Sequence, residues 1–278
     1  MTGFVTGDGR THIASKLMAE SLVDRRVAAT THSEFEYSIL PDAKLVSIGG
    51  QSIFDRGSAA LRPLVEELAA TRGKHQVVVG VGGGTRVRHT IAIAADLGLP
   101  LGGIAQLVGA MEEANAVMLN ALLAKRGSIV MQREHFWEMP LYLENGMIPI
   151  VISTPPYHFW EPPNEGSSLP THGSDFGLFM HAEVLGMKQI IFVKDEDGLY
   201  DRDPKQHEGA KLIRRTTLEE IWNHMPGELI LDRKLFEVWH SARHVERVQI
   251  VNGLKLGELT RALAGEDAGT VITRGARQ

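Results

Sequence analysis

The segment from residue 189 to residue 204 carries the strongest chemical signal in this sequence. The apolar run 190–193 predicts a buried strand of a parallel sheet, and a lysine and three carboxylates follow it directly at positions 194–197. Ligands of open α/β sheets bind at the carboxyl ends of strands. There Lys194 would neutralise phosphate oxygens while a carboxylate positions Mg²⁺, so the pattern suits a metal-bound polyphosphate. By composition alone, a solvated acidic turn fits equally well.

Two glycine-rich turns are further candidates for phosphate or oxyanion binding. Gly49-Gly50 and Gly82-Gly83-Gly84 each follow a predicted strand. Glycine lets backbone N–H groups approach an anion closely, and the N-terminus of a following helix adds positive potential. Neither turn fits the P-loop or the dinucleotide-binding pattern, so each is also explained as a tight βα turn.

Charged residues beside these turns could contact a ligand. The triple glycine is followed by Arg86, Arg88 and His89, and a guanidinium at this place could bind an oxyanion. It is equally possible that these arginines only lie on the surface of a helix. Asp175 stands at a predicted helix start, where it would either cap the helix or orient an active-site lysine.

Histidine is the natural neutral ligand of a metal or oxometalate centre. Of the twelve histidines, His158 is the most interesting, because it lies in a proline-rich loop at 155–170. For any single histidine, surface or core hydrogen bonding is the simpler explanation.

Length and composition limit the classes of protein to which this chain can belong. The chain has 278 residues, 43% hydrophobic and 23% charged, which is typical of a globular protein. A net charge of −5 gives no basic footprint for nucleic acid, and we see neither a signal peptide nor an apolar run near the roughly 20 residues of a membrane span. Without cysteine, disulfides, thiolate metal sites and a cysteine nucleophile are excluded, and a cytoplasmic location is the simplest inference.

Strand and helix patterns alternate from residue 44 onward. They predict a mostly parallel α/β sheet covered on both faces, within one domain at 39–278 that follows an N-terminal arm at 1–38 with a short helix near 13–27. Ser174 is the expected N-cap of one helix, and Thr216 and Glu219 form the expected capping box of another. Strands are expected at 45–48, 76–81, 129–130, 149–153, 190–193, 248–251 and 270–273, and helices at 59–72, 86–97, 107–126, 174–186, 216–224, 231–244 and 256–264.

Taken in order, these segments resemble the amino acid kinase superfamily, in the branch that contains bacterial UMP kinases and molybdenum storage proteins. The resemblance covers roughly residues 40–274. Strings similar to UMP kinases are 82–86, 193–204 and 265–270, and longer strings similar to molybdenum storage subunits, mostly of the β type, are 48–52, 55–57, 155–157, 191–200 and 247–254.

The superfamily resemblance implies a three-layer αβα sandwich with an ATP site and Mg²⁺. The storage branch implies a hexameric cage of homologous subunits, including a second subunit type, that uses ATP to load molybdate or tungstate as polyoxometalate clusters. The implied site residues are Lys194, Asp175 and Asp197 at the catalytic end; Gly49, Gly50, Gly198, Tyr200, Asp203 and Pro204 around the nucleotide; Gly82, Gly83, Gly84, Thr85 and Arg86 around the oxyanion; and His158 as a cavity metal ligand.

Departures from the family pattern leave three hypotheses. Ser47 stands where the superfamily has a phosphate-binding lysine, which disfavours ordinary kinase activity, because one such contact contributes several kcal/mol to transition-state stabilisation. Ala110 stands where UMP kinases have a ribose-binding aspartate, and Ala114 and Phe159 replace a glutamine and a histidine of the storage branch. The hypotheses are a storage subunit whose loading is coupled to ATP hydrolysis, a UMP-kinase-like phosphotransferase with another acceptor, and a non-catalytic architectural paralogue.

Overall fold

The computed structural model describes residues 4–6, 11–13, 38–153, 172–223 and 229–275, in two compact units, Met1–Tyr37 and Ser38–Gln278. In the first unit, β1 (Phe4–Thr6) and β2 (Thr11–Ile13) form an antiparallel hairpin. The helix predicted near 13–27 lies outside the described residues except for Ile13, which belongs to β2.

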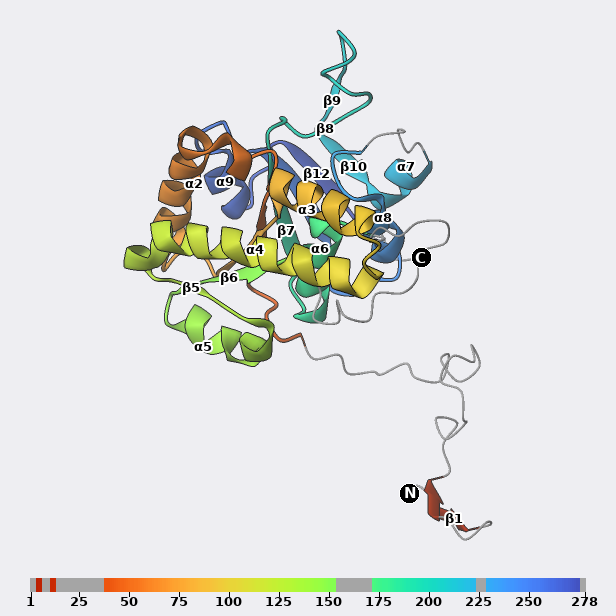
Figure 1. The fold of residues 1–278 in the computed structure, drawn as a ribbon. Helices are drawn as coiled ribbons and strands as arrows, with labels where there is room; N and C mark the ends of the chain where they lie inside the picture. Colours follow the sequence, from red (N-terminus) through yellow and green to blue (C-terminus); the bar gives the residue numbers. More distant parts are fainter. Residues whose placement is uncertain (1–3, 7–10, 14–37, 154–171, 224–228, 276–278) are drawn as a thin grey trace. The chain divides into compact units, whose positions relative to one another are not determined.

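The second unit is built on an eight-stranded sheet in the order β10-β12-β11-β7-β3-β4-β6-β5 (Figure 1). Its strands are β3 (Lys44–Ile48), β4 (Val77–Val81), β5 (Ser128–Val130), β6 (Ile148–Ile152), β7 (Gln189–Lys194), β10 (Arg215–Thr217), β11 (Arg247–Asn252) and β12 (Thr270–Thr273). All neighbouring pairs are parallel except β11 and β12. The central strands are mostly apolar and almost entirely buried, because helices cover both of their faces.

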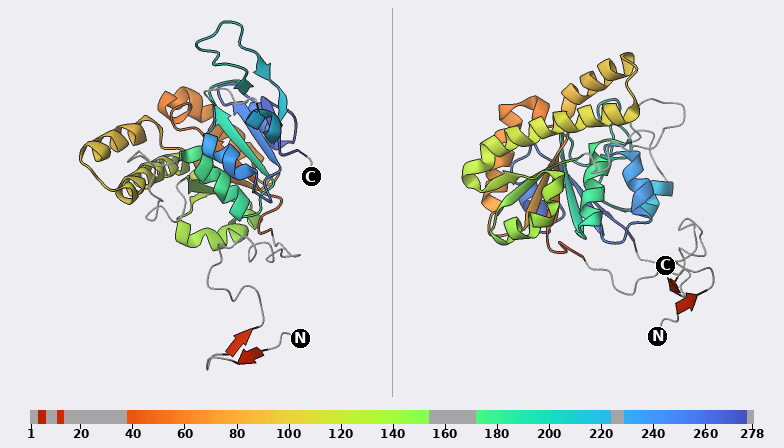
Figure 2. Two further views of the ribbon diagram at one scale, coloured as in Figure 1. Left: turned by 90° about the vertical axis from the view of Figure 1, so that its right-hand side faces the viewer. Right: turned by 60° about the horizontal axis from the view of Figure 1, so that its bottom comes forward.

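Alternating side chains divide the core between the two faces of the sheet. Val46 and Ile48 pack with α2 (Ser58–Thr71), α4 (Leu101–Leu123) and α9 (Glu258–Leu263) on one face. Leu45 and Phe192 pack on the other face with a second group of helices. That group is α5 (Met139–Glu144), α6 (Ser174–Val184), α7 (Leu218–Asn223) and α8 (Arg233–Trp239). The arrangement confirms the predicted three-layer αβα fold (Figure 2).

The remaining elements lie outside these layers. Helix α3 (Gly84–Asp96) packs along α4, and β8 (Leu199–Tyr200) pairs with β9 (Leu212–Ile213) in a hairpin apart from the main sheet. Three short 3₁₀ helices complete the described chain: η2 (Phe54–Arg56), η3 (Ala124–Arg126) and η4 (Arg133–Glu138). Neither the β8–β9 hairpin nor α5 was predicted.

Several expected helix boundaries were wrong, among them that of the helix expected at 231–244, which is α8 at Arg233–Trp239. The long helix begins at Leu101 rather than 107, because its Gly102-Gly103 pair lies within the helix. Ser174 is the first residue of α6 and not its N-cap, which is Gly173. The capping box is one residue later than predicted: Thr217 Oγ1 accepts the N–H of Glu220, whose carboxylate accepts the N–H of Thr217.

Helix α4 keeps an apolar stripe exposed along its length. Leu107, Val117, Met118 and Leu122 lie on it at helical spacing and are each exposed. Together with η3, this helix is long and apolar enough to cross a membrane by length and composition alone, a weak criterion that core helices also meet. No apolar run of that length was expected from the sequence.

Candidate functional site

A cleft of about 860 Å³ opens at the carboxyl ends of the central strands. Gly49 and Gly50 follow β3, Gly83 and Gly84 follow β4, and Lys194 ends β7. The described residues that line it are 49–52, 55, 56, 83, 84, 87, 88, 91, 105, 108, 112, 153, 172–175, 194, 195, 205 and 229–232. Its position is the one at which open α/β sheets bind ligands.

A lysine–aspartate pair stands within the cleft. Lys194 Nζ donates to both carboxylate oxygens of Asp175, each at 2.8 Å, and both side chains are largely buried. Burial raises the pKa of Asp175, and the negative charge of Asp232 raises it further, while Lys194 opposes both effects. Of the two roles predicted for Asp175, the structure selects the contact with the lysine.

The two glycine turns fit into each other. A Cβ on Gly50 would lie 2.2 Å from the backbone N of Gly84, so a side chain there would collide with the second turn. Gly84 has φ of +73°, a conformation that favours glycine. This close approach positions the start of α3 beside the end of β3, as a phosphate-binding turn requires.

The donors predicted for the oxyanion are partly engaged by the protein itself. The N–H of Thr85 donates to Asp55 Oδ2 at 2.6 Å, and the guanidinium of Arg86 donates to Asn115 Oδ1. Asn115 in turn donates to the carbonyl of Gly82 at 2.6 Å. Arg88, which the sequence analysis considered beside Arg86, is the arginine of α3 that lines the cleft.

Ser47 is buried inside β3. Its side chain is 2% exposed, and in the ladder it stands between Gly80 of β4 and Phe192 of β7. It does not belong to the described lining of the cleft. A longer side chain at this position would be needed to bring a charge to the cleft.

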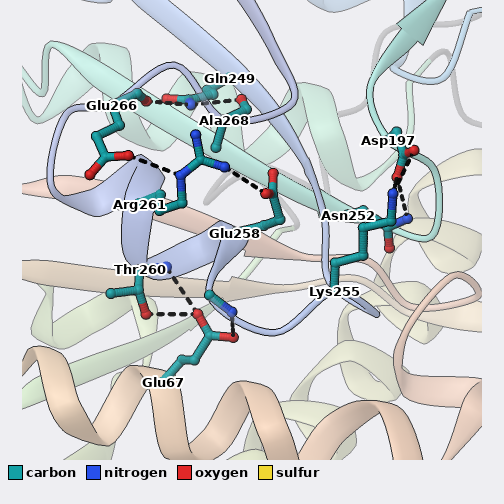
Figure 3. A network of polar contacts seen from close by, with 11 residues as sticks. Glu67, Asp197, Gln249, Asn252, Lys255, Glu258, Thr260, Arg261, Glu266 and Ala268 are labelled. Atoms are coloured by element: carbon teal, nitrogen blue, oxygen red, sulfur yellow. Dashed lines mark hydrogen bonds and ion pairs between the residues drawn. The ribbon is translucent and has the colours of Figure 1, made fainter.

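The second part of the predicted nucleotide segment lies beyond the described cleft lining. Asp197 accepts hydrogen bonds from Asn252 Nδ2 at 2.8 Å and from Lys255 Nζ at 2.7 Å (Figure 3). The hydrogen bond from Lys255 is the largest cause of a lowered pKa for Asp197. Neither partner was predicted from the sequence, where the Asn252-Gly253 turn after a strand was their only signal.

The remaining predicted residues of this segment form turn structure. Gly198 has φ of +148°, Tyr200 ends β8, and Asp203 Oδ1 accepts the N–H of Lys205 after Pro204. Lys205 also lines the cleft, and its Nζ lies 3.0 Å from Oε1 of Glu196.

Several cleft residues had no clear sequence signal. Arg56, which lines the cleft, pairs with Asp195 at 2.6 Å. The buried carboxylate of Glu112 accepts hydrogen bonds from both the N–H and the hydroxyl of Ser153, at the end of β6. Contacts between residues this far apart in sequence depend on the folded sheet, which no local pattern reveals.

Metal ligation was expected at His158, which lies outside the described residues. Within the described ranges, no group of three or more His, Asp or Glu side chains is arranged to hold a metal ion. A divalent cation in the described part of the cleft would therefore need oxygen ligands from the bound molecule as well.

Comparison with known proteins decides the family. The sequence profile of the amino acid kinase family matches residues 43–252. This chain belongs to the amino acid kinase family. Within it, the chain is 44% identical over 257 residues to the molybdenum storage protein subunit beta of Azotobacter vinelandii, covering 92% of this chain and 95% of that protein. The uridylate kinase of Methanobrevibacter smithii is 26% identical over 239 residues, covering 82% of this chain and 97% of the kinase.

Solved structures agree on the fold of this amino acid kinase family member. The UMP kinase of Bacillus anthracis superposes with a TM-score of 0.66 at 19% identity, over 85% of this chain and 98% of that one. The uridylate kinase of Archaeoglobus fulgidus gives a TM-score of 0.65 at 21% identity, over 83% and 99%. The resemblance inferred from the sequence motifs is confirmed.

Proposed function

We propose that this protein is an ATP-binding subunit of a storage assembly for molybdate or tungstate, in which MgATP drives loading of polyoxometalate clusters. The observation that carries the proposal is the 44% identity to a molybdenum storage protein subunit across nearly the whole chain. An identity of this size over both chains supports a shared ligand class more strongly than the fold does, since one fold serves many functions.

Lys194 and the glycine turns support nucleotide binding in the cleft. Lys194 would neutralise phosphate oxygens, and Gly49 and Gly50 line the same cleft, where the absence of side chains leaves room for an anion. Mg²⁺ usually binds through one or two carboxylates together with substrate phosphates, and Asp195, which lines the cleft and pairs with Arg56, would be such a carboxylate. The bound cation would neutralise charge on the phosphate chain. The segment 197–204 would flank the nucleotide.

The oxyanion would meet the other side of the cleft. In this proposal the turn at Gly82–Gly84 and an arginine of α3 face it, and Arg88 is better placed than Arg86, which is held by Asn115. His158 would serve as a cavity ligand.

Association with homologous subunits is supported by the exposed apolar stripe of α4. Leu107, Val117, Met118 and Leu122 would be covered by another subunit, in keeping with a hexameric cage of one or two subunit types. In this proposal residues 1–38 are an arm outside the kinase-like domain, and the assembly acts in the cytoplasm.

The direct test is retention of metal. The purified protein is incubated with molybdate and MgATP, desalted, and analysed for metal per chain, with tungstate in a parallel sample. Metal well above one atom per chain supports storage, with more retained when MgATP is present than when it is omitted. No retained metal, together with phosphoryl transfer to a nucleotide, would replace this proposal with the kinase alternative.

A UMP-kinase-like phosphotransferase remains the second candidate, because the Lys194–Asp175 pair and the glycine turns are in place. Ser47→Lys tests whether the site is a decayed kinase centre. If it is, the added charge should raise the rate of ATP turnover by tenfold or more, since about 1.4 kcal/mol of transition-state stabilisation corresponds to a factor of ten. Ser47→Met, of similar length without charge, should not. An unchanged rate in Ser47→Lys would show that the phosphate site is elsewhere, and ATP binding without turnover or metal would leave an architectural subunit.

A further inference from the structure

Asp232 occupies a helix-capping position but does not cap its own helix. It directly precedes α8, and its carboxylate makes no capping hydrogen bond to that helix, all of whose residues are described. Instead, its Oδ2 accepts the N–H of Phe176 at 3.1 Å, in the first turn of α6. The carboxylate thus caps a helix that lies 56 residues earlier in the sequence.

The first turn of α6 is the part of the helix that carries Asp175. Asp175 is the second residue of α6, and its carboxylate holds the buried Lys194 through two hydrogen bonds of 2.8 Å. Asp232 lines the same cleft. Whatever fixes this turn therefore also fixes the lysine that faces the ligand.

Gly173 provides the space for this contact. A Cβ at Gly173 would lie 2.8 Å from both carboxylate oxygens of Asp232, so alanine there would push the carboxylate away. The backbone of Gly173 is extended, with φ of −106°, so alanine would introduce no backbone strain. The glycine thus matters for the approach of Asp232 and not for a special backbone conformation.

A purely structural cap would not favour a carboxylate here. Burial raises the pKa of Asp175, and the negative charge of Asp232 raises it further, against the opposing effect of Lys194. Asn caps as well as Asp without this charge. The charged groups that act on Asp175 are Lys194 from β7 and Asp232 before α8, while the ring of His172 lies against that of Phe176.

We propose that Asp232 is a positioning residue of the cleft, which fixes the first turn of α6 and thereby holds Asp175 against Lys194. The inference rests on the proposed function in that MgATP is taken as the ligand of Lys194. The negative charge of Asp232 also disfavours a phosphate chain that carries no cation. The cleft therefore binds MgATP in preference to free ATP.

Three variants separate the hydrogen bond from the charge. Asp232→Asn keeps an acceptor for Phe176 and removes the charge, Asp232→Ala removes both, and Gly173→Ala displaces the carboxylate without changing the charge of the protein. MgATP affinity is measured by calorimetry, and the titration of Asp175 by carboxyl ¹³C NMR in the protein without nucleotide. Thermal unfolding checks that each variant is folded.

We expect Asp232→Ala and Gly173→Ala to weaken MgATP binding about tenfold, the effect of one lost hydrogen bond, and Asp232→Asn to restore it to within about threefold. In Asp232→Asn, Asp175 should titrate at lower pH, and the preference for MgATP over free ATP should shrink. Wild-type affinity in Asp232→Ala, or an unchanged Asp175 titration in Asp232→Asn, would overturn the inference. If the wild type binds no MgATP, the proposed function fails, while the NMR titration still decides the role of Asp232.

Discussion

Two lysine–aspartate pairs form at the same edge of the sheet, and their surroundings differ sharply. Lys194 and Asp175 meet inside the cleft with side chains 13% and 8% exposed, whereas Lys255 and Asp197 meet at its outside with side chains 58% and 34% exposed. The contact distances are nearly equal, at 2.8 and 2.7 Å. The difference is therefore one of desolvation: removing one partner of a buried pair leaves an uncompensated charge, while water screens an exposed pair.

The largest effect is expected from breaking the buried pair. Lys194→Met should lower the free energy of unfolding by about 3 kcal/mol, because Asp175 is left buried without its cation. Lys255→Met, the matched control, should lower it by less than about 1 kcal/mol. Urea denaturation measures both.

Adding Asp175→Asn to Lys194→Met should recover most of the loss, since the second change removes the buried charge. If Lys194→Met and Lys255→Met were equally stable, burial would not distinguish the two lysine–aspartate pairs.

The glycine turns beside the buried pair should be similarly intolerant of change. Gly50→Ala would place a Cβ 2.2 Å from the backbone N of Gly84, and we expect the resulting overpacking to destabilise the protein by about 1–3 kcal/mol. Gly103→Ala is the control, because its Cβ would make only ordinary contacts, at 3.7 Å, with Pro100 just before α4, so this change should be neutral or stabilising. Thermal unfolding compares them, and a stable Gly50→Ala would contradict the interlocking of the two turns.

The smallest effect is a difference in pH dependence between the two aspartates. The pKa of Asp197 is lowered in the folded protein, so its contribution is present above its unfolded pKa of about 3.9 and is lost as the pH falls through the folded value. The pKa of Asp175 is raised, so its burial disfavours folding above its folded pKa, and this penalty is relieved as the pH falls toward the unfolded value.

Asp197→Asn should thus be less stable than the wild type by under about 1 kcal/mol at pH 7, and this gap should close as the pH falls below about 3.9. Urea denaturation across this pH range measures the difference. A gap that persists at the lowest pH would show that the Asp197 contact does not depend on its charge.

The buried Lys194–Asp175 pair could be predicted from the sequence better than the exposed Lys255–Asp197 pair. The strand before Lys194 is an unbroken apolar run, and parallel strands bring their carboxyl ends to one edge, so the placement of Lys194 and the glycine turns followed from local patterns. The helix-start position of Asp175 left two roles open, and contact with β7 decided between them.

The missed contacts are long-range. Asp232 lies 56 residues from Phe176, and Lys255 lies 58 residues from Asp197, so only the folded sheet brings them together. Arg86 and Arg88 are indistinguishable in sequence, and the direction of each side chain from α3 follows from how that helix packs on α4.

The central claim is that the buried Lys194 end of the cleft holds nucleotide phosphates. Calorimetric titration with MgATP of the wild type, Lys194→Met/Asp175→Asn and Lys255→Met tests it most directly, after each protein is shown to be folded. Loss of the phosphate contact predicts at least about tenfold weaker binding in the double variant and a change of under about threefold in Lys255→Met. Equal affinity of the double variant and the wild type would contradict the claim.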